Sequence, residues 1–340
     1  MDHVKTAISS LKLAEPTTHG GLTIFPLTSG LDSNFRYLLL EEGLRKELVT
    51  IREVSEGGSV PELTVKNRAD VPVLIVDGEE LVGAKQNRVA NLTMLLPAEK
   101  STIIPVSCVE AGRWSYSRPD FGVTDRVQNA RGRAEKLADV RESIRHTGSR
   151  RSDQGRVWDS LAEESASLEA DSPTGAISAM FDRHRETLDD YVDAVSPLPG
   201  QIGAVFIVHN RRYGLDLFDQ PDTFAGFLPK LVRSYAIDVL GRRSRHKGTG
   251  APEAQAFLNR ILRGTFDDHP AVGLGRDVGI VGEGLVAGAL VAGETVLHLT
   301  AFAEALNGRR TSGNPSGRGH RARYPSHRQR QDAMRRRYGR

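Results

Sequence analysis

Residues 71–96, VPVLIVDGEELVGAKQNRVANLTMLL, decide how the first part of the chain is interpreted. Val71–Val76 is a compact apolar run with the length of a buried strand, and Val89–Leu96 is another. Asp77-Gly78 stands between them, and both residues tolerate the positive φ angles of tight hairpin turns. The stretch therefore predicts core strands joined by a hairpin that is dense in polar groups.

Short apolar or alternating runs continue on both sides of this stretch, so residues 20–117 are expected to be β-rich. These runs are bounded by turn-forming residues, and they cover Leu22–Leu27, Leu48–Val54, Leu63–Lys66 and Thr102–Val109. A single helix over about Phe35–Lys46 is expected to interrupt the strands.

In residues 124–195 the apolar residues recur with the period of a helix. Apolar side chains between Ala176 and Val192 recur on one stripe of a 3.6-residue helix, and the stripe includes His184, which is expected to be a packed core histidine. The polar, arginine-rich stretch Arg141–Arg156 is interpreted as an exposed loop between helices. Pro197 follows and ends the helical block.

Strands and helices alternate after residue 202. Ala204–Val208 and Tyr213–Phe218 predict a hairpin, and Asp222 is expected to cap a long amphipathic helix that closes at Gly241. Gly241–Gly250 is expected to be a basic loop. A short helix and three strands complete the pattern, at Pro252–Leu262, Val278–Val281, Leu285–Val291 and Thr295–Phe302.

The pattern predicts an α+β fold. Residues 20–303 are expected to form a single domain with a helical insertion at about 124–195, whose sheet is completed by the C-terminal strands and the amphipathic helix. Residues 308–340 hold eleven arginines and one acidic residue, a net charge of +10, and are expected to be a disordered tail. Because the whole chain is +3, residues 1–307 carry 3 − 10 = −7.

Several classes of protein are disfavoured. No run of 18 apolar residues indicates a membrane span, and the N-terminus lacks the pattern of a secretory signal. Cys108 is the only cysteine, so an internal disulfide is excluded and a reducing, cytoplasmic location is expected. HExxH, CxxC, GxGxxG and GxxxxGK[ST] motifs are missing, so no metal site is expected and no cofactor is identified.

The first candidate site lies in the polar segment of the opening stretch. Lys85, Asn87 and Arg88 stand beside core strands, where such donors can bind a sugar, a phosphate or a polar base. Glu79 and Glu80 are candidate general acid and base groups, although adjacent strand residues point to opposite faces. The alternative is a solvated hairpin that carries its charges outward.

The second candidate site is Val106–Tyr116. Arg113, Trp114 and Tyr116 combine a guanidinium with aromatic faces, which suits a nucleobase or a ribose phosphate. Glu110 is a candidate base, and Cys108 a candidate nucleophile, although its place at the end of an apolar strand favours a structural thiol. The tryptophan can equally plug the edge of a sheet. His209 and His298 end or interrupt strands and are weaker candidates.

Both stretches carry a resemblance. Leu74–Arg88 and Ile104–Tyr116 resemble the signature of a prokaryotic family associated with ADP-ribosylglycohydrolase and rhodanese-phosphatase proteins, and the similarity extends over about residues 20–303. The family has no established catalytic set to transfer. Its association implies a role near NAD or ADP-ribose metabolism.

Three functions are therefore expected in order. The first is binding or processing of an ADP-ribose-like nucleotide, with Trp114 or Tyr116 stacking on the base and Lys85, Arg88 and Arg113 holding phosphates. The second is a non-catalytic partner or scaffold for an ADP-ribose-processing enzyme. The third is non-specific association with nucleic acid through the basic tail, which the acidic body and the scarcity of tail aromatics disfavour.

Overall fold

The largest sheet joins strands from both ends of the chain. The computed structural model describes residues 1–30, 33–241 and 250–304, and it places nine antiparallel strands in the order β1-β3-β13-β14-β18-β17-β16-β15, with β2 on β3. Their bounds are β1 Lys12–Leu13, β2 Thr17–His19, β3 Leu22–Thr28, β13 Gln201–Val208, β14 Arg212–Phe218, β15 Thr265–Pro270, β16 Arg276–Gly282, β17 Leu285–Ala292 and β18 Thr295–Glu304. The predicted C-terminal strands are thus confirmed, and β15 is an addition.

The hairpin between β13 and β14 is confirmed. Val208 pairs with Arg212, and His209 and Asn210 at the turn both have positive φ, 51° and 54°. Asparagine is among the residues that adopt this left-handed region most readily, which explains why the turn could be read from the sequence.

Residues 38–127 form two smaller sheets, and the hairpin expected at Asp77-Gly78 is wrong. One sheet has the order β10-β7-β4 and the other β12-β8-β9-β11-β6-β5, so the strands before and after Gly78 pair with different partners. Gly78 has φ +80°, but its N–H donates to Ala90 and its carbonyl accepts from Gln128. The turn therefore passes the chain between sheets. The bounds are β4 Leu38–Leu39, β5 Val49–Glu53, β6 Glu62–Asn67, β7 Val73–Ile75, β8 Glu79–Gly83, β9 Arg88–Ala90, β10 Met94–Leu96, β11 Ser101–Cys108 and β12 Phe121–Val127.

The helices lie where the sequence pattern predicts them, but some details differ. Arg141–Arg156 is not one exposed loop, because Arg141 lies buried within α3 and its guanidinium meets the Asp277 carboxylate at 2.6 Å. Asp222 does not cap α7, since Gln220 is the N-cap residue and Pro221 begins the helix. The bounds are α1 Asp2–Ser9, α2 Leu40–Arg45, α3 Ala130–Thr147, α4 Gln154–Ser167, α5 Ser178–Arg183, α6 Arg185–Asp193, α7 Pro221–Leu240 and α8 Ala251–Leu262.

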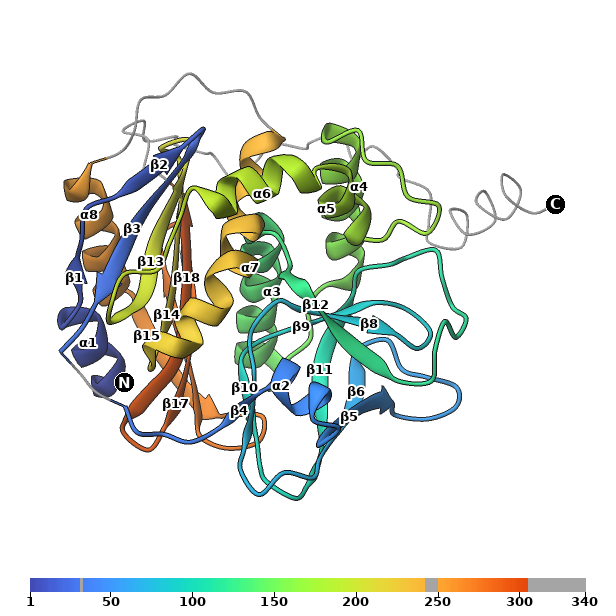
Figure 1. Cartoon of the computed structure of the whole chain (residues 1–340). Coiled ribbons are helices and arrows are strands. Elements are labelled where there is room, and N and C mark those ends of the chain that lie inside the picture. Colours follow the sequence, from blue (N-terminus) through green and yellow to red (C-terminus); the bar gives the residue numbers. More distant parts are fainter. Residues whose placement is uncertain (31–32, 242–249, 305–340) are drawn as a thin grey trace, which may run out of the picture. The chain divides into compact units, whose positions relative to one another are not determined.

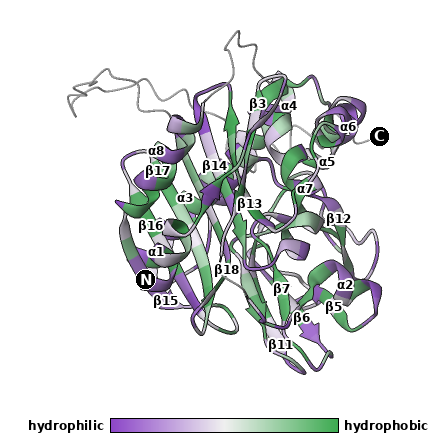
Figure 2. Ribbon diagram, turned by 60° about the vertical axis from the view of Figure 1, so that its left-hand side comes forward, coloured by the Kyte–Doolittle hydropathy of each residue, from purple (hydrophilic) through white to green (hydrophobic). Residues whose placement is uncertain are grey.

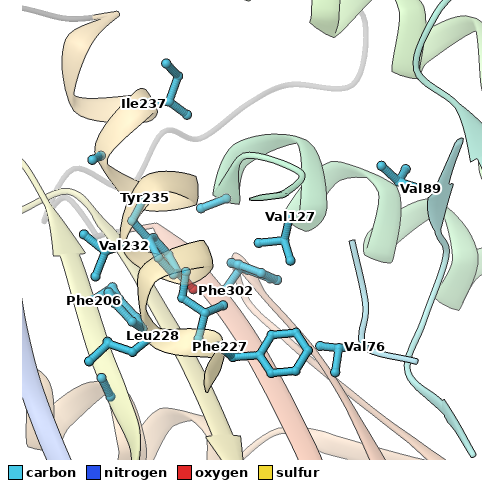
Figure 3. Close-up of a cluster of buried hydrophobic side chains, with 14 of the residues drawn as sticks. Val76, Val89, Val127, Phe206, Phe227, Leu228, Val232, Tyr235, Ile237 and Phe302 are labelled. Atoms are coloured by element: carbon cyan, nitrogen blue, oxygen red, sulfur yellow. The ribbon is translucent and has the colours of Figure 1, made fainter. Parts of the chain in front are cut away.

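Helices α3 and α7 lie between the nine-stranded sheet and the two smaller sheets (Figure 1). The apolar stripe of α7 packs on β13, where the rings of Tyr235 and Phe206 stack with centroids 4.1 Å apart (Figure 3). The same core cluster includes Val76 from the end of β7 and Val127 from β12. One apolar layer thus joins the helices to both sheet systems, and the fold is α+β.

The opposite face of the nine-stranded sheet is covered by α1 and α8, which bury Val4, Phe257 and Ile261 in a separate core cluster. The strand ribbons are mainly hydrophobic along β13, whereas α6 is mainly hydrophilic (Figure 2). The described residues, which end at Glu304, form one compact unit. The expected basic loop, apart from its end residues, and the expected tail lie outside the described residues. Among the described residues, no helix has the length and apolar content to cross a membrane.

Candidate functional site

The two sequence motifs meet at one surface, here called the motif surface and defined by Lys85, Trp114 and Tyr116. The Lys85 ammonium lies 5.3 Å from the ring centroid of each aromatic residue. Trp114 is 47% and Tyr116 52% exposed, although large hydrophobic side chains are usually covered. Lys85 also donates to the carbonyls of Glu56 and Gly57, at 2.5 and 2.9 Å. The surface thus presents two aromatic rings with a fixed positive charge between them.

Arg113 holds the loop that carries the aromatic residues. Its guanidinium meets the Glu110 carboxylate at 2.7 Å and donates to Asn87 at 3.0 Å. It also donates to the backbone carbonyls of Gly83, Ala84 and Ser115. Every nitrogen of the guanidinium therefore has an acceptor within the protein. This arrangement gives Arg113 and Asn87 a positioning role in the loop.

Arg88 lies beneath Trp114 and is fully buried. Its guanidinium carbon is 5.8 Å from the Trp114 ring centroid, and Nη1 donates to Gln86 at 3.1 Å. Nε and Nη2 have no hydrogen-bond partner among the described residues, and the nearest carboxylate oxygen, on Glu53, is 4.0 Å from Nη2. A buried guanidinium with unpaired donors is unusual, because each such donor loses its hydration without replacement.

Cys108 is next to Arg88 and is held as a thiol. Its Sγ is 3.2 Å from the Gln86 side-chain oxygen, and the side chain is fully buried. Burial raises the pKa of Cys108, and the nearby Arg88 charge only partly opposes that shift. A raised pKa leaves little thiolate at neutral pH, so this geometry favours a structural cysteine.

The three candidate glutamates do not share one pocket. Glu79 accepts the Val76 N–H at 2.7 Å, whereas Glu80 pairs with Arg126 at 3.2 Å. Burial raises the pKa of both carboxyls. Glu110 accepts from Thr174 through one oxygen and from Asn87 and Arg113 through the other. The expectation that Glu79 and Glu80 point to different surroundings agrees with these contacts, but neither is solvated as the alternative required.

A buried charge cluster lies between the sheets, and sequence reasoning missed most of it. Arg133 of α3 meets Asp216 of β14 at 2.6 Å and Asp77 at 3.1 Å, and Lys136 meets Asp77 at 2.8 Å. Burial opposes ionisation of Asp216, but Arg133 and His298 outweigh it and lower the pKa of this carboxyl to about 2. The signal available in the sequence was a charged residue inside an apolar strand, Leu-Asp-Leu at 215–217.

The cluster contains a hydroxyl, an imidazole and a carboxylate in a row. Thr93 Oγ1 is 2.7 Å from His298 Nδ1, and His298 Nε2 is 3.4 Å from Asp216 Oδ1. This order matches the nucleophile, base and orienting group of hydrolases. However, the adjacent space has a volume of about 10 Å³, enough for one water molecule at most. The space beside the row is therefore too small for a substrate.

The family of the chain follows from a comparison with known proteins. The family model described as ARG and Rhodanese-Phosphatase-superfamily-associated Protein domain matches residues 10–302. The chain belongs to this family. The matched region includes both motifs and the β13–α7 segment, so the resemblance drawn from the sequence is confirmed. No curated protein and no solved structure shows a significant match to the chain.

This ARG and Rhodanese-Phosphatase-superfamily-associated Protein domain also has a pocket outside the motif surface. The pocket has a volume of about 360 Å³ and lies between α3, the C-terminal half of α7 and the ends of β14, β17 and β18. Asp238 lines it and accepts the Asn129 amide at 2.9 Å, and Glu164 accepts the same amide at 2.9 Å. Burial and the Asp238 charge raise the pKa of Glu164 to about 8.

Proposed function

We propose that the domain binds an ADP-ribose-like nucleotide at the motif surface. The observation that carries the proposal is the placement of the Lys85 ammonium 5.3 Å from the rings of both Trp114 and Tyr116. Exposed aromatic rings stack on nucleobases, and a lysine beside them attracts phosphate. The family's association with ARG proteins, meaning ADP-ribosylglycohydrolases, points to the same ligand class.

In this proposal, three of the six predicted binding residues contact the nucleotide and the other three support them. Trp114 or Tyr116 stacks on the adenine, and Lys85 faces the phosphates. Arg113 and Asn87 position the loop, because their hydrogen bonds are made within the protein. Arg88 supports Trp114 from below through the cation–π contact at 5.8 Å and adds positive charge to the site.

Calorimetric titration of the full chain with ADP-ribose tests the proposal. Removal of an aromatic stacking partner costs about 1–3 kcal/mol per base, so Trp114→Ala is expected to weaken ADP-ribose binding by about 5- to 150-fold. Lys85→Met is expected to weaken binding and to reduce its dependence on salt. Lys66→Met is the matched control, since Lys66 is exposed on β6. Absent binding to the wild-type chain, or equal affinities for all these variants, would refute the site.

The exposure of Trp114 and Tyr116 also suits a second function, a binding surface for a protein partner. Tryptophan, tyrosine and arginine are the residue types that dominate binding energy at protein interfaces. The scaffold function replaces the nucleotide function if two results are found together. The wild-type chain must show no binding to ADP-ribose, NAD or AMP, and it must bind a partner enzyme that the Trp114→Ala variant does not bind.

A further inference from the structure

The pocket between α3, α7 and the strand ends shares no lining residue with the motif surface. Its volume of about 360 Å³ falls in the range of roughly 300–1,000 Å³ that is typical of small-molecule sites. It is thus separate from the site proposed for the nucleotide, and the class of its ligand follows from the residues that line it.

Small residues on α3 create the space. Ala130, Ala134 and Ala138 recur every fourth residue, so they lie on one face of the helix, and all three line the pocket. Val286 of β17 and Phe302 of β18 line it from the sheet. A leucine or phenylalanine at any of the alanine positions would reach across toward these strands. The wall formed by these five residues is apolar and suits a hydrocarbon or aromatic group.

Asp238 and Arg212 supply the pocket with an acceptor and a donor. Asp238 accepts the backbone N–H of Arg131 at 2.7 Å and the Asn129 amide at 2.9 Å. Each carboxylate oxygen keeps a further lone pair, because a carboxylate accepts about four hydrogen bonds. Burial raises the pKa of Asp238, and the charge of Arg212 on β14, which also lines the pocket, partly opposes that shift.

The lining charges balance. Three arginines face three acidic residues, namely Arg131, Arg156 and Arg212 against Glu135, Asp238 and Glu304. A ligand with several negative charges would gain no net attraction from such a lining. A neutral or zwitterionic ligand fits it better, since each of its charged ends meets an opposite charge.

We propose that this pocket binds a free amino acid with a large apolar side chain. The ammonium group donates to Asp238, the carboxylate faces Arg212, and the side chain lies against the α3 alanines and Phe302. This ligand class is different from the nucleotide of the motif surface, so the inference goes beyond the proposed function.

Titration of the full chain with three related probes tests the proposal. L-Phenylalanine carries both charges, 3-phenylpropionate lacks the ammonium group, and 2-phenylethylamine lacks the carboxylate. L-Phenylalanine is expected to bind, and each of the other two is expected to bind at least about tenfold more weakly, the loss of one charged contact. No binding of L-phenylalanine, or equal binding of 3-phenylpropionate, would overturn the proposal.

Variants test whether L-phenylalanine binds in this pocket. Ala134→Leu fills the apolar wall and is expected to weaken L-phenylalanine binding at least tenfold, and Arg212→Gln is expected to do the same without adding bulk. Ala162→Leu is the control, since Ala162 is exposed on α4. Trp114→Ala is expected to keep L-phenylalanine binding, so failure of the nucleotide site leaves this test intact. Wild-type affinity in both Ala134→Leu and Arg212→Gln would refute the assignment.

Discussion

Glu164→Gln is expected to stabilise the domain and to flatten its dependence on pH. Glu164 is 8% exposed, and it shares the Asn129 amide with Asp238, so two carboxylates compete within one buried site. Burial, followed by the Asp238 charge, raises the pKa of Glu164 from 4.5 to about 8. Because this pKa is raised for a carboxyl, the folded state holds a proton between pH 4.5 and 8 that the unfolded state releases.

The sign and size of the effect follow from proton linkage. Stability from this group is fully present below pH 4.5, falls by about 1.4 kcal/mol per pH unit, and levels off above pH 8. The complete shift corresponds to at most about 5 kcal/mol, because each pKa unit is worth about 1.4 kcal/mol. The glutamine side chain of the variant resembles the protonated acid and keeps an oxygen for Asn129, so the variant avoids this loss.

Urea unfolding at pH 5, 6, 7 and 8 measures the difference. The stability gap between Glu164→Gln and the wild-type chain is expected to widen as pH rises through this window. Glu163→Gln is the matched control, because the Glu163 side chain is 69% exposed and meets Arg131 at 3.3 Å. Its curve is expected to stay parallel to that of the wild-type chain. Parallel curves for Glu164→Gln as well would show that Glu164 is ionised in the fold.

Three further outcomes follow from the buried groups and from the charge distribution. Arg133→Met leaves the Asp77 and Asp216 carboxylates with too few partners and is expected to lower the free energy of unfolding by about 3–5 kcal/mol. Arg52→Met removes an exposed ion pair and is expected to leave the free energy of unfolding nearly unchanged, so similar urea midpoints for the two variants would contradict a stabilising role of the buried cluster. Cys108 is expected to react with a disulfide reagent at the rate of unfolding, and fast labelling of the native chain would show an accessible thiolate. Deletion of residues 308–340 removes a net charge of +10 and is expected to abolish retention on DNA at low salt; unchanged retention would exclude the tail as the contact.

Local sequence pattern predicted several of the main elements. The apolar series of α7 and the apolar run of β13 are local properties, and the turn at Asn210 needs only local chemistry. The sequence was less informative about which strands pair with each other. Asp77-Gly78 has the composition of a hairpin turn, but β7 pairs with β10 and β4 whereas β8 pairs with β9 and β12, so the two strands beside this turn are not partners.

The buried ion pairs could not be predicted from the local sequence. Arg141 lies in a stretch whose composition indicates exposure, yet Asp277, far along the chain, neutralises it. Arg133 and Asp216 are separated in the same way. The motif surface was easier to foresee, since Trp114 and Tyr116 are neighbours in sequence and only Lys85 had to be brought to them.

The ion network around Arg133 limits how the domain can be divided for expression. Its two carboxylates, Asp77 and Asp216, come from different sheet systems, and the arginine comes from the helix between them. A fragment that ends before β13 would retain Arg133 and Asp77 but lack Asp216. In the complementary fragment, Asp216 would lose its arginine partner and keep its contacts with Tyr235 and His298. Neither half is expected to be soluble alone. A circular permutant that opens the chain at the exposed Gly148 keeps all three residues and is expected to fold.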